Sequence, residues 1–211
     1  MKDDAPTETV TPGVASCAHG VCPWYLGYFL ASPLRRLFEN PERILQPLVR
    51  PGMTVLEPGC AMGFFTLPLA RLVGPGGRVV CADLQPKMIE GLRKRAKKAG
   101  LIDRIETSVC TPGDLGVGEW AGRVDLALAI HVVHEIRDPA AFLRQVHAAL
   151  RPGGRLLVLE PKGHVNPSQF AATIAAAEAV GFTAGPAPLP PRRLAVLLAK
   201  ADVPGASLPV E

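Results

Sequence analysis

The feature that most constrains the fold is the stretch from Thr54 to Ala70, which reads TVLEPGCAMGFFTLPLA. A short apolar run ends in an acid, Glu57, and passes through a turn of small residues into a run with helical spacing, where Phe65 and Leu69 share one face. This order predicts a strand, a tight loop and a helix. Small residues at alternate positions let the loop backbone approach a ligand, while the N-terminus of the helix points free N–H groups at it. We therefore expect a ligand to lie across this loop.

The spacing within the loop distinguishes classes of nucleotide-binding enzyme. A dinucleotide fingerprint is G-x-G-x-x-G, but here Phe64 stands at the required glycine, which argues against a nicotinamide-dependent oxidoreductase. The loop instead resembles motif I of the class I S-adenosylmethionine-dependent methyltransferases, in which it wraps the methionine part of the cofactor. Ala61 in place of the middle glycine is a mild departure. The resemblance implies cofactor contacts from Glu57, Gly59, Cys60, Ala61 and Gly63.

A second acid follows the next apolar strand, residues 78–83. Asp83 lies roughly 20 residues beyond the loop, where a carboxylate takes up ribose hydroxyls in nucleotide-binding βαβ units, although a strand-end Asp can also simply cap the next helix. In the resembling family an acid here holds both ribose hydroxyls, so the resemblance assigns this role to Asp83, with Leu84 beside it.

The loop after the third strand, residues 104–109, departs from the family. An acid usually reads the adenine amino group there, but Thr111 stands at that position. Adenine recognition then falls to the Thr111 hydroxyl, to backbone groups or to Asp114.

Histidines follow the fourth strand, residues 125–130. This strand ends at Ile130, which the resemblance places among the cofactor contacts, and runs into His131 and His134. The family often has a Leu-His-His type turn here, bordering the transferable methyl group, and Glu135 replaces the second histidine. Histidine titrates in the range needed to remove a proton from an acceptor, but each one can instead make a structural hydrogen bond. The candidate bases are His134, then His131, then His164 with Glu160.

Apolar strands alternate with amphipathic helices along the chain, which predicts an α/β fold with a mostly parallel sheet covered on both faces. The resemblance extends over about residues 45–200. It implies a Rossmann-like, doubly wound sheet of seven strands in the order 3-2-1-4-5-7-6, with a C-terminal antiparallel hairpin. We expect a Pro-Gly-Gly turn at 152–154 before the fifth strand and a turn at Gly181 and Phe182 after a helix over 167–180; the sixth strand is not visible in the pattern.

The chain divides into four parts: residues 1–20, a flexible arm; 21–50, a helical lid; 51–200, the cofactor-binding domain; and 201–211, a loose tail. The arm runs into Cys17, His19 and Cys22, which are compatible with metal or metalloid ligation, an inert thiol pair or a redox pair. Residues 23–38 are the most aromatic stretch, compatible with a membrane surface, a lid over an apolar cleft or packing on the sheet. We favour the lid, because the family commonly places N-terminal elements over the substrate side.

Composition excludes several function classes. The formal net charge of +4, from 23 basic and 19 acidic residues, is too mild to imply a nucleic-acid partner. No apolar stretch approaches the roughly 20 residues that span a bilayer, so we expect no stable membrane insertion. The start of the chain lacks the apolar segment of a secretory signal, so a cytoplasmic location is the expectation.

The resemblance implies in-line displacement at a sulfonium methyl group. No long insertion follows the fifth strand, so residues 17–45 must supply much of the pocket, which favours a small, apolar or aromatic acceptor. The subfamily resemblance is to the methyltransferase type 11 branch with quinone and sterol C-methyltransferases and arsenite methyltransferases. Arsenite is disfavoured, because histidines stand where those enzymes carry further cysteines. A non-catalytic cofactor-binding module or regulatory subunit is the alternative from another class.

Overall fold

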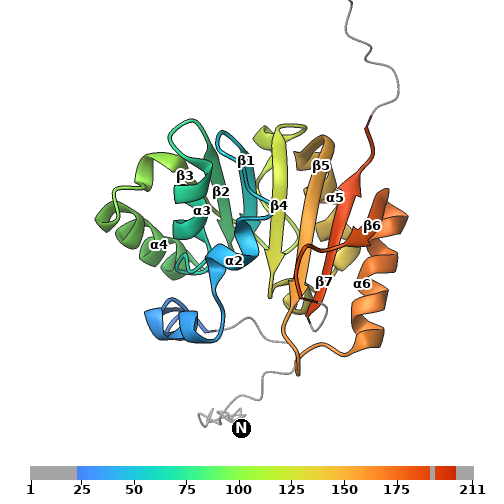
Figure 1. Ribbon diagram of the computed structural model, residues 1–211, viewed down its shortest axis with the longest axis horizontal. Coiled ribbons are helices and arrows are strands. Elements are labelled where there is room, and N and C mark those ends of the chain that lie inside the picture. Colours follow the sequence, from blue (N-terminus) through green and yellow to red (C-terminus); the bar gives the residue numbers. More distant parts are fainter. Residues whose placement is uncertain (1–22, 191–192, 203–211) are drawn as a thin grey trace, which may run out of the picture.

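The computed structural model describes residues 23–190 and 193–202 and shows one seven-stranded sheet in the order β3-β2-β1-β4-β5-β7-β6 (Figure 1). The first five strands in the order of the chain pair in parallel, and β7 pairs antiparallel with both β5 and β6. The predicted fold class and strand order are confirmed. The strands are β1 (Thr54–Pro58), β2 (Arg78–Asp83), β3 (Ile105–Val109), β4 (Val124–Ile130), β5 (Leu150–Glu160), β6 (Phe182–Pro186) and β7 (Leu194–Lys200).

Helices cover both faces of the sheet, and each face has its own hydrophobic cluster. Along β5, Leu157 and Leu159 pack into one cluster and Leu156 and Val158 into the other, as the two-residue period of a buried strand requires. The second, third and fourth helices contribute to the first cluster, and the fifth and sixth to the second. The helices are α1 (Leu26–Leu30), α2 (Pro41–Leu45), α3 (Thr66–Val73), α4 (Pro86–Lys98), α5 (Pro139–Ala149) and α6 (Pro167–Val180).

Side-chain caps fix where the helices begin. Asn40 caps α2 by accepting a hydrogen bond from the Arg43 amide, and Asp138 caps α5 in the same way through the Ala141 amide. Asn166 and Gln169 form a reciprocal capping box at the start of α6. Because α5 and α6 begin where the chain leaves the carboxyl ends of β4 and β5, these caps also position the loops that carry the histidines.

Two expectations about the C-terminal half were wrong in detail. Gly181 is a left-handed C-cap with φ of 109°, but Phe182 already begins β6 instead of completing a turn. This strand escapes a pattern search because it is short, contains Gly185 and Pro186, and lies at the sheet edge, where proline is tolerated. The Pro-Gly-Gly sequence is an irregularity within β5: the chain advances from Leu150 to Arg155 while β4 advances only from Val124 to Leu126.

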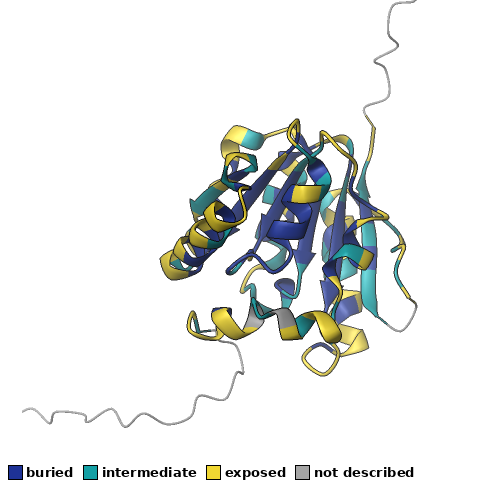
Figure 2. Ribbon diagram, turned by 60° about the vertical axis from the view of Figure 1, so that its left-hand side comes forward, coloured by how far each residue is buried: buried dark blue, intermediate teal, exposed yellow. Residues whose placement is uncertain are grey.

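The N-terminal segment consists of α1, a 3₁₀ turn (Pro33–Leu37) and α2, and it lies at the carboxyl edge of the sheet (Figure 2). Much of its outer surface is exposed, whereas the strands behind it are buried. In the described part of the chain, no helix is both long enough and apolar enough to cross a membrane. The predicted arm with Cys17, His19 and Cys22, and the tail from residue 203, lie outside the described residues.

Candidate active site

A cleft of about 1540 Å³ opens at the carboxyl edge of the sheet. Its walls are the loop after β1, the ends of β4 and β5, the first turns of α5 and α6, and the N-terminal segment. Ligands of parallel sheets bind at this edge, where the strand order reverses between β1 and β4. Pockets for one small ligand measure roughly 300–1,000 Å³, so the cleft has room for a cofactor and an acceptor side by side.

The loop after β1 comes close to its neighbours at two glycines in the left-handed region. A Cβ atom on Gly59 (φ 69°) would lie 2.6 Å from a methyl carbon of Val132, and one on Gly63 (φ 83°) would lie 2.5 Å from a methyl carbon of Leu92. Both positions therefore require glycine. Ala61 between them has φ of 45°, which strains a residue with a side chain. The loop is held in one tight shape with its backbone toward the cleft.

Two buried carboxyl groups stand at the ends of β1 and β2. Asp83 accepts hydrogen bonds from the amides of Ala61 and Gln85, both at 2.9 Å, and so ties the loop to the end of β2. Glu57 accepts a hydrogen bond of 2.6 Å from the Thr66 hydroxyl, and burial raises its pKa to about 7. A cationic group of a ligand, such as the ammonium group of an amino acid, would stabilise the ionised form of Glu57 if it bound beside this carboxyl group.

The structure brings most of the predicted cofactor contacts to the cleft. Five of them line it directly, whereas Gly63, Asp83 and Leu84 do not belong to its lining. Thr111 lies in an exposed tight turn, where its backbone N–H and C=O pair with those of Asp114. Its role toward adenine therefore stays a prediction. The five lining residues are Glu57, Gly59, Cys60, Ala61 and Ile130.

His134 and Glu160 form a hydrogen-bonded pair in the cleft wall. The Nδ1 atom of His134 lies 2.6 Å from Oε2 of Glu160, and the His134 amide donates to the other carboxylate oxygen at 3.2 Å. Glu160 is only 3% exposed, so its charge acts in a poorly solvated site. The hydrogen bond that His134 donates to Glu160 raises the pKa of His134 above its ordinary value. Because the carboxylate fixes the proton on Nδ1, Nε2 is left to accept one.

His131 is engaged by the N-terminal segment instead. Its Nδ1 lies 3.3 Å from a guanidinium nitrogen of Arg35, and its Nε2 lies 3.5 Å from a carboxylate oxygen of Glu39. Burial lowers the pKa of His131, and the neutral ring accepts from Arg35 at Nδ1. Because Nδ1 is occupied and Nε2 lies beside the Glu39 carboxylate, His131 is a poor base. Its φ of 57° is also in the left-handed region, and it turns the ring toward this network.

His164, the third candidate, is exposed and stacks edge-on against His134 with 5.9 Å between ring centroids. The expected pairing of His164 with Glu160 was wrong, because this carboxylate binds His134. All three histidines line the same cleft.

Sequence reasoning missed a cluster of charged side chains in the cleft. Arg35 donates to Glu39 at 2.7 Å and lies 4.3 Å above the ring of Phe64, while Arg193 reaches Glu39 from the start of β7 at 3.2 Å. Glu39 and Arg193 are 154 residues apart, so no motif could have linked them. The only available signal was the polar residues within an otherwise aromatic segment.

This fold and its cleft define the class of α/β proteins with a Rossmann-like sheet that bind a ligand at its carboxyl edge. The chain matches the methyltransferase domain family over residues 50–182. This match covers more than half of the sequence, so the chain belongs to the methyltransferase domain family and is an S-adenosylmethionine-dependent methyltransferase.

Relatives and solved structures agree with this assignment. The chain is 32% identical to a ubiquinone biosynthesis O-methyltransferase of Methylocella silvestris over 204 residues, which are 90% of this chain and 74% of that protein. It is 34% identical to the ubiquinone/menaquinone biosynthesis C-methyltransferase UbiE of Hahella chejuensis, over 56% of this chain and 47% of that protein. The fold is shared with a SAM-dependent methyltransferase from Aquifex aeolicus (TM-score 0.73, 21% identity), over 85% of this chain and 98% of that one.

Proposed function

We propose that the protein methylates a hydroxyl group of a small, apolar or aromatic acceptor. The observation that carries this proposal is the pair of His134 and Glu160 in the cleft wall. A base is needed only where the nucleophile must lose a proton, as a hydroxyl does. The relative from Methylocella silvestris is named an O-methyltransferase, which is consistent with this choice over carbon.

The residues at the carboxyl ends of β1 and β2 have the chemical groups needed to bind S-adenosylmethionine. S-adenosylmethionine, when bound, supplies a methyl group on a sulfonium centre. Gly59 leaves no room for a side chain and so keeps the loop backbone close to the cleft, and Glu57 can receive the ammonium of the methionine part. Asp83 would hold the ribose hydroxyls, since it lies at the end of β2 and already orients the loop through the Ala61 amide.

His134 then removes the acceptor proton at Nε2. Glu160 holds the ring in the required tautomer and stabilises the imidazolium that forms. His164, beside it, narrows the acceptor side of the cleft. The chain also aligns the acceptor oxygen with the methyl group. Because both reactants are then held in the reactive geometry, the entropy cost of bringing them together is met on binding and not in the reaction step.

The N-terminal segment would act as a lid over the acceptor side. Arg35 and Glu39 connect it to His131 at the end of β4, and Arg35 also covers Phe64 of the cofactor loop. A closed lid excludes water from the reacting groups. In this account His131 is a positioning residue that anchors the lid.

Two narrower expectations accompany the proposal. We expect the protein to act in the cytoplasm, and we expect no nucleic-acid substrate, because the net charge is only +4.

The test is a methyl-transfer assay with methyl-labelled S-adenosylmethionine and a panel of acceptors. The panel contains phenols, catechols and reduced quinones, with thiols, amines and arsenite for comparison. We expect label on the oxygen of an aromatic acceptor. Transfer only to thiols, amines or arsenite would overturn the acceptor class. Tight binding of S-adenosylhomocysteine without transfer to any acceptor would instead support a non-catalytic module.

A further inference from the structure

Large apolar side chains are exposed almost solely on the N-terminal segment. Eight of the nine that the described residues contain lie between positions 24 and 38, and the ninth is Val109. Single exposed apolar residues are ordinary on a protein surface, but a contiguous group marks a surface that contacts a partner. We call this group the aromatic face; it consists of Trp24, Tyr25, Leu26, Tyr28, Phe29, Leu34, Leu37 and Phe38.

The N-terminal segment turns its small residues toward the protein and its bulky apolar residues outward, which is the reverse of a helix that only covers a core. Gly27, Ala31 and Arg35 lie against the rest of the protein. A Cβ atom on Gly27 would lie 2.6 Å from the sulfur of Met88, and the Ala31 carbonyl accepts from Arg95 at 3.1 Å. A helix normally buries its bulky apolar side chains and exposes its small and polar ones. This arrangement needs a second apolar environment on the outside.

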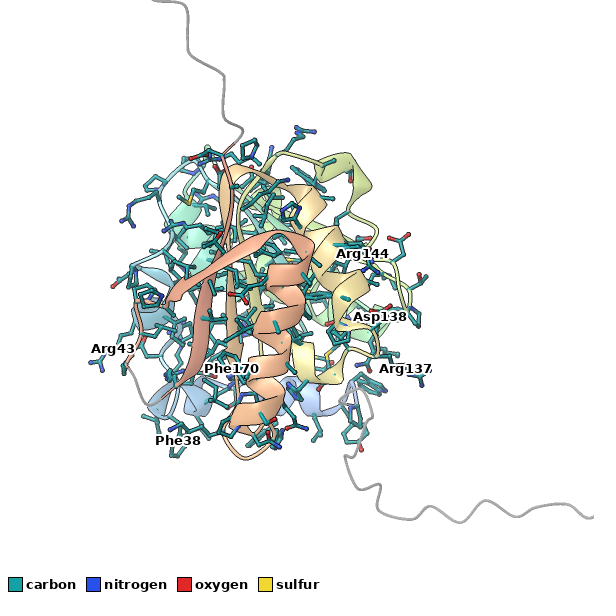
Figure 3. All side chains as sticks on the ribbon, turned by 90° about the vertical axis from the view of Figure 1, so that its right-hand side faces the viewer. Phe38, Arg43, Arg137, Asp138, Arg144 and Phe170 are labelled. Carbon is teal, nitrogen blue, oxygen red and sulfur yellow. The ribbon has the colours of Figure 1, made fainter. Side chains whose placement is uncertain are left out.

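The exposure values agree with this sidedness. Phe29 is 73% exposed and Phe38 is 88% exposed. Figure 3 shows Phe38 extending away from the fold, and Arg43 of the neighbouring helix also points outward. An exposed aromatic surface with cationic side chains at its edge is typical of proteins that bind at the interface of a bilayer.

Basic side chains border the aromatic face. The segment lies below α4 (Figure 1), and Nζ of Lys87 on that helix is 5.3 Å from the ring centroid of Trp24. The exposed side of α4 carries one acid, Glu90, among five basic residues. Such a surface attracts negative charge. The five basic residues are Lys87, Arg93, Lys94, Lys97 and Lys98.

We propose that the aromatic face and the exposed basic side of α4 dock the protein onto a bilayer surface that contains anionic lipids. Tryptophan and tyrosine prefer the boundary between headgroups and acyl chains, and short helices can lie flat in it without spanning the membrane. A second copy of the chain fits less well, because a two-fold interface would bring the two basic helices together.

Docking would place the cleft against the lipid. Leu26 and Phe38 belong both to the aromatic face and to the cleft lining. An apolar acceptor dissolved in the bilayer could then reach the cleft without crossing water. This consequence rests on the proposed acceptor class, whereas the docking itself does not.

The test is sedimentation of the full-length protein with sucrose-loaded vesicles, made of phosphatidylcholine alone or mixed with phosphatidylglycerol. We expect binding to the mixed vesicles that weakens as salt is added. The double variant Tyr28→Ser, Phe29→Ser should bind about tenfold more weakly. Val109→Ser removes the ninth of these exposed side chains, which lies outside the aromatic face, and should leave binding unchanged. Lys97→Glu with Lys98→Glu should weaken binding only to the anionic vesicles.

Three results would overturn the proposal. The first is no binding to the mixed vesicles, or binding that the Tyr28 and Phe29 substitutions leave intact. The second is a stable dimer that Phe29→Ser dissociates, without vesicle binding, because a second copy would then occupy the face. The third is binding only after removal of residues 1–22, because that segment would be the occupant. The affinity for S-adenosylhomocysteine should be unchanged in each variant, which would show that the fold is intact. Failure of the docking proposal can therefore be distinguished from failure of the proposed function.

Discussion

The cofactor side and the acceptor side of the cleft are built in different ways. On the cofactor side, one loop and two strand ends within residues 57–83 provide the geometry, and backbone groups form most of it. On the acceptor side, residues from distant parts of the chain meet through side-chain contacts: Arg35 contacts Glu39 and His131, and His134 contacts Glu160.

This difference explains why one side is easier to infer than the other. Backbone geometry depends on the spacing of small residues, which a sequence displays directly. A side-chain pair such as His134 and Glu160 depends on the packing of two strands that are neighbours only in the folded sheet. The two sides should therefore be separable, and a substitution on one side should leave the other intact.

The largest effect is expected on the acceptor side. His134→Ala should lower kcat about 100-fold or more, because it removes the proposed base, while the affinity for S-adenosylhomocysteine stays nearly unchanged. Steady-state kinetics and calorimetry measure the two quantities. His147→Ala is the matched control, since that ring packs on Phe182 outside the cleft. Equal kcat in the His134 variant and the wild type would remove His134 from the mechanism.

The second largest effect is expected on the pH dependence of kcat. The active form of His134 is the neutral one, so kcat falls as the pH drops through its pKa, which Glu160 raises above 6.5. Glu160→Gln removes this stabilisation of the imidazolium, so the fall in kcat should move to lower pH. Glu135→Gln should give a smaller shift in the same direction, because Glu135 contributes only through its charge. A profile that both variants leave in place would contradict the pairing.

A smaller effect is expected at the lid. Arg35→Ala breaks its contacts with Glu39, His131 and Phe64, and should raise the acceptor KM about fivefold with little change in cofactor affinity. The neighbouring Arg36 is the control, because it pairs with Glu42 in an exposed ion pair away from the cleft. If Arg36→Ala had the same effect, the lid contacts of Arg35 would not be the cause.

The smallest effect is expected in the cofactor loop. Ala61→Gly relieves a left-handed φ of 45° and should stabilise the fold by on the order of 1 kcal/mol, or about 2–4 °C in Tm. Gly59→Ala should lower Tm, since its Cβ would lie 2.6 Å from Val132. Thermal unfolding followed by circular dichroism measures both. A Tm that falls in the Ala61 variant would show that this backbone is not strained.

The sequence predicted nearly all of the sheet, because five buried strands alternate with helices and end in recognisable loops. It failed at β6, an edge strand of five residues that include a glycine and a proline and that pair only with β7. The spacing of small residues, with the resemblance to motif I that it carries, placed Glu57, Gly59 and Ala61 at the cleft. Sequence reasoning assigned Glu160 to the wrong histidine, because the choice between His134 and His164 depends on where the loop after β5 turns, which no local pattern encodes.

The most direct test of the central claim is a calorimetric titration of the protein with S-adenosylhomocysteine. We predict micromolar binding that Asp83→Ala weakens about 100-fold, because this buried carboxylate orients the loop and is the proposed partner of the ribose hydroxyls. Asp103→Ala, on an exposed turn before β3, should bind like the wild type. Absence of binding, or equal binding by the Asp83 variant, would contradict the assignment of the cofactor to this loop.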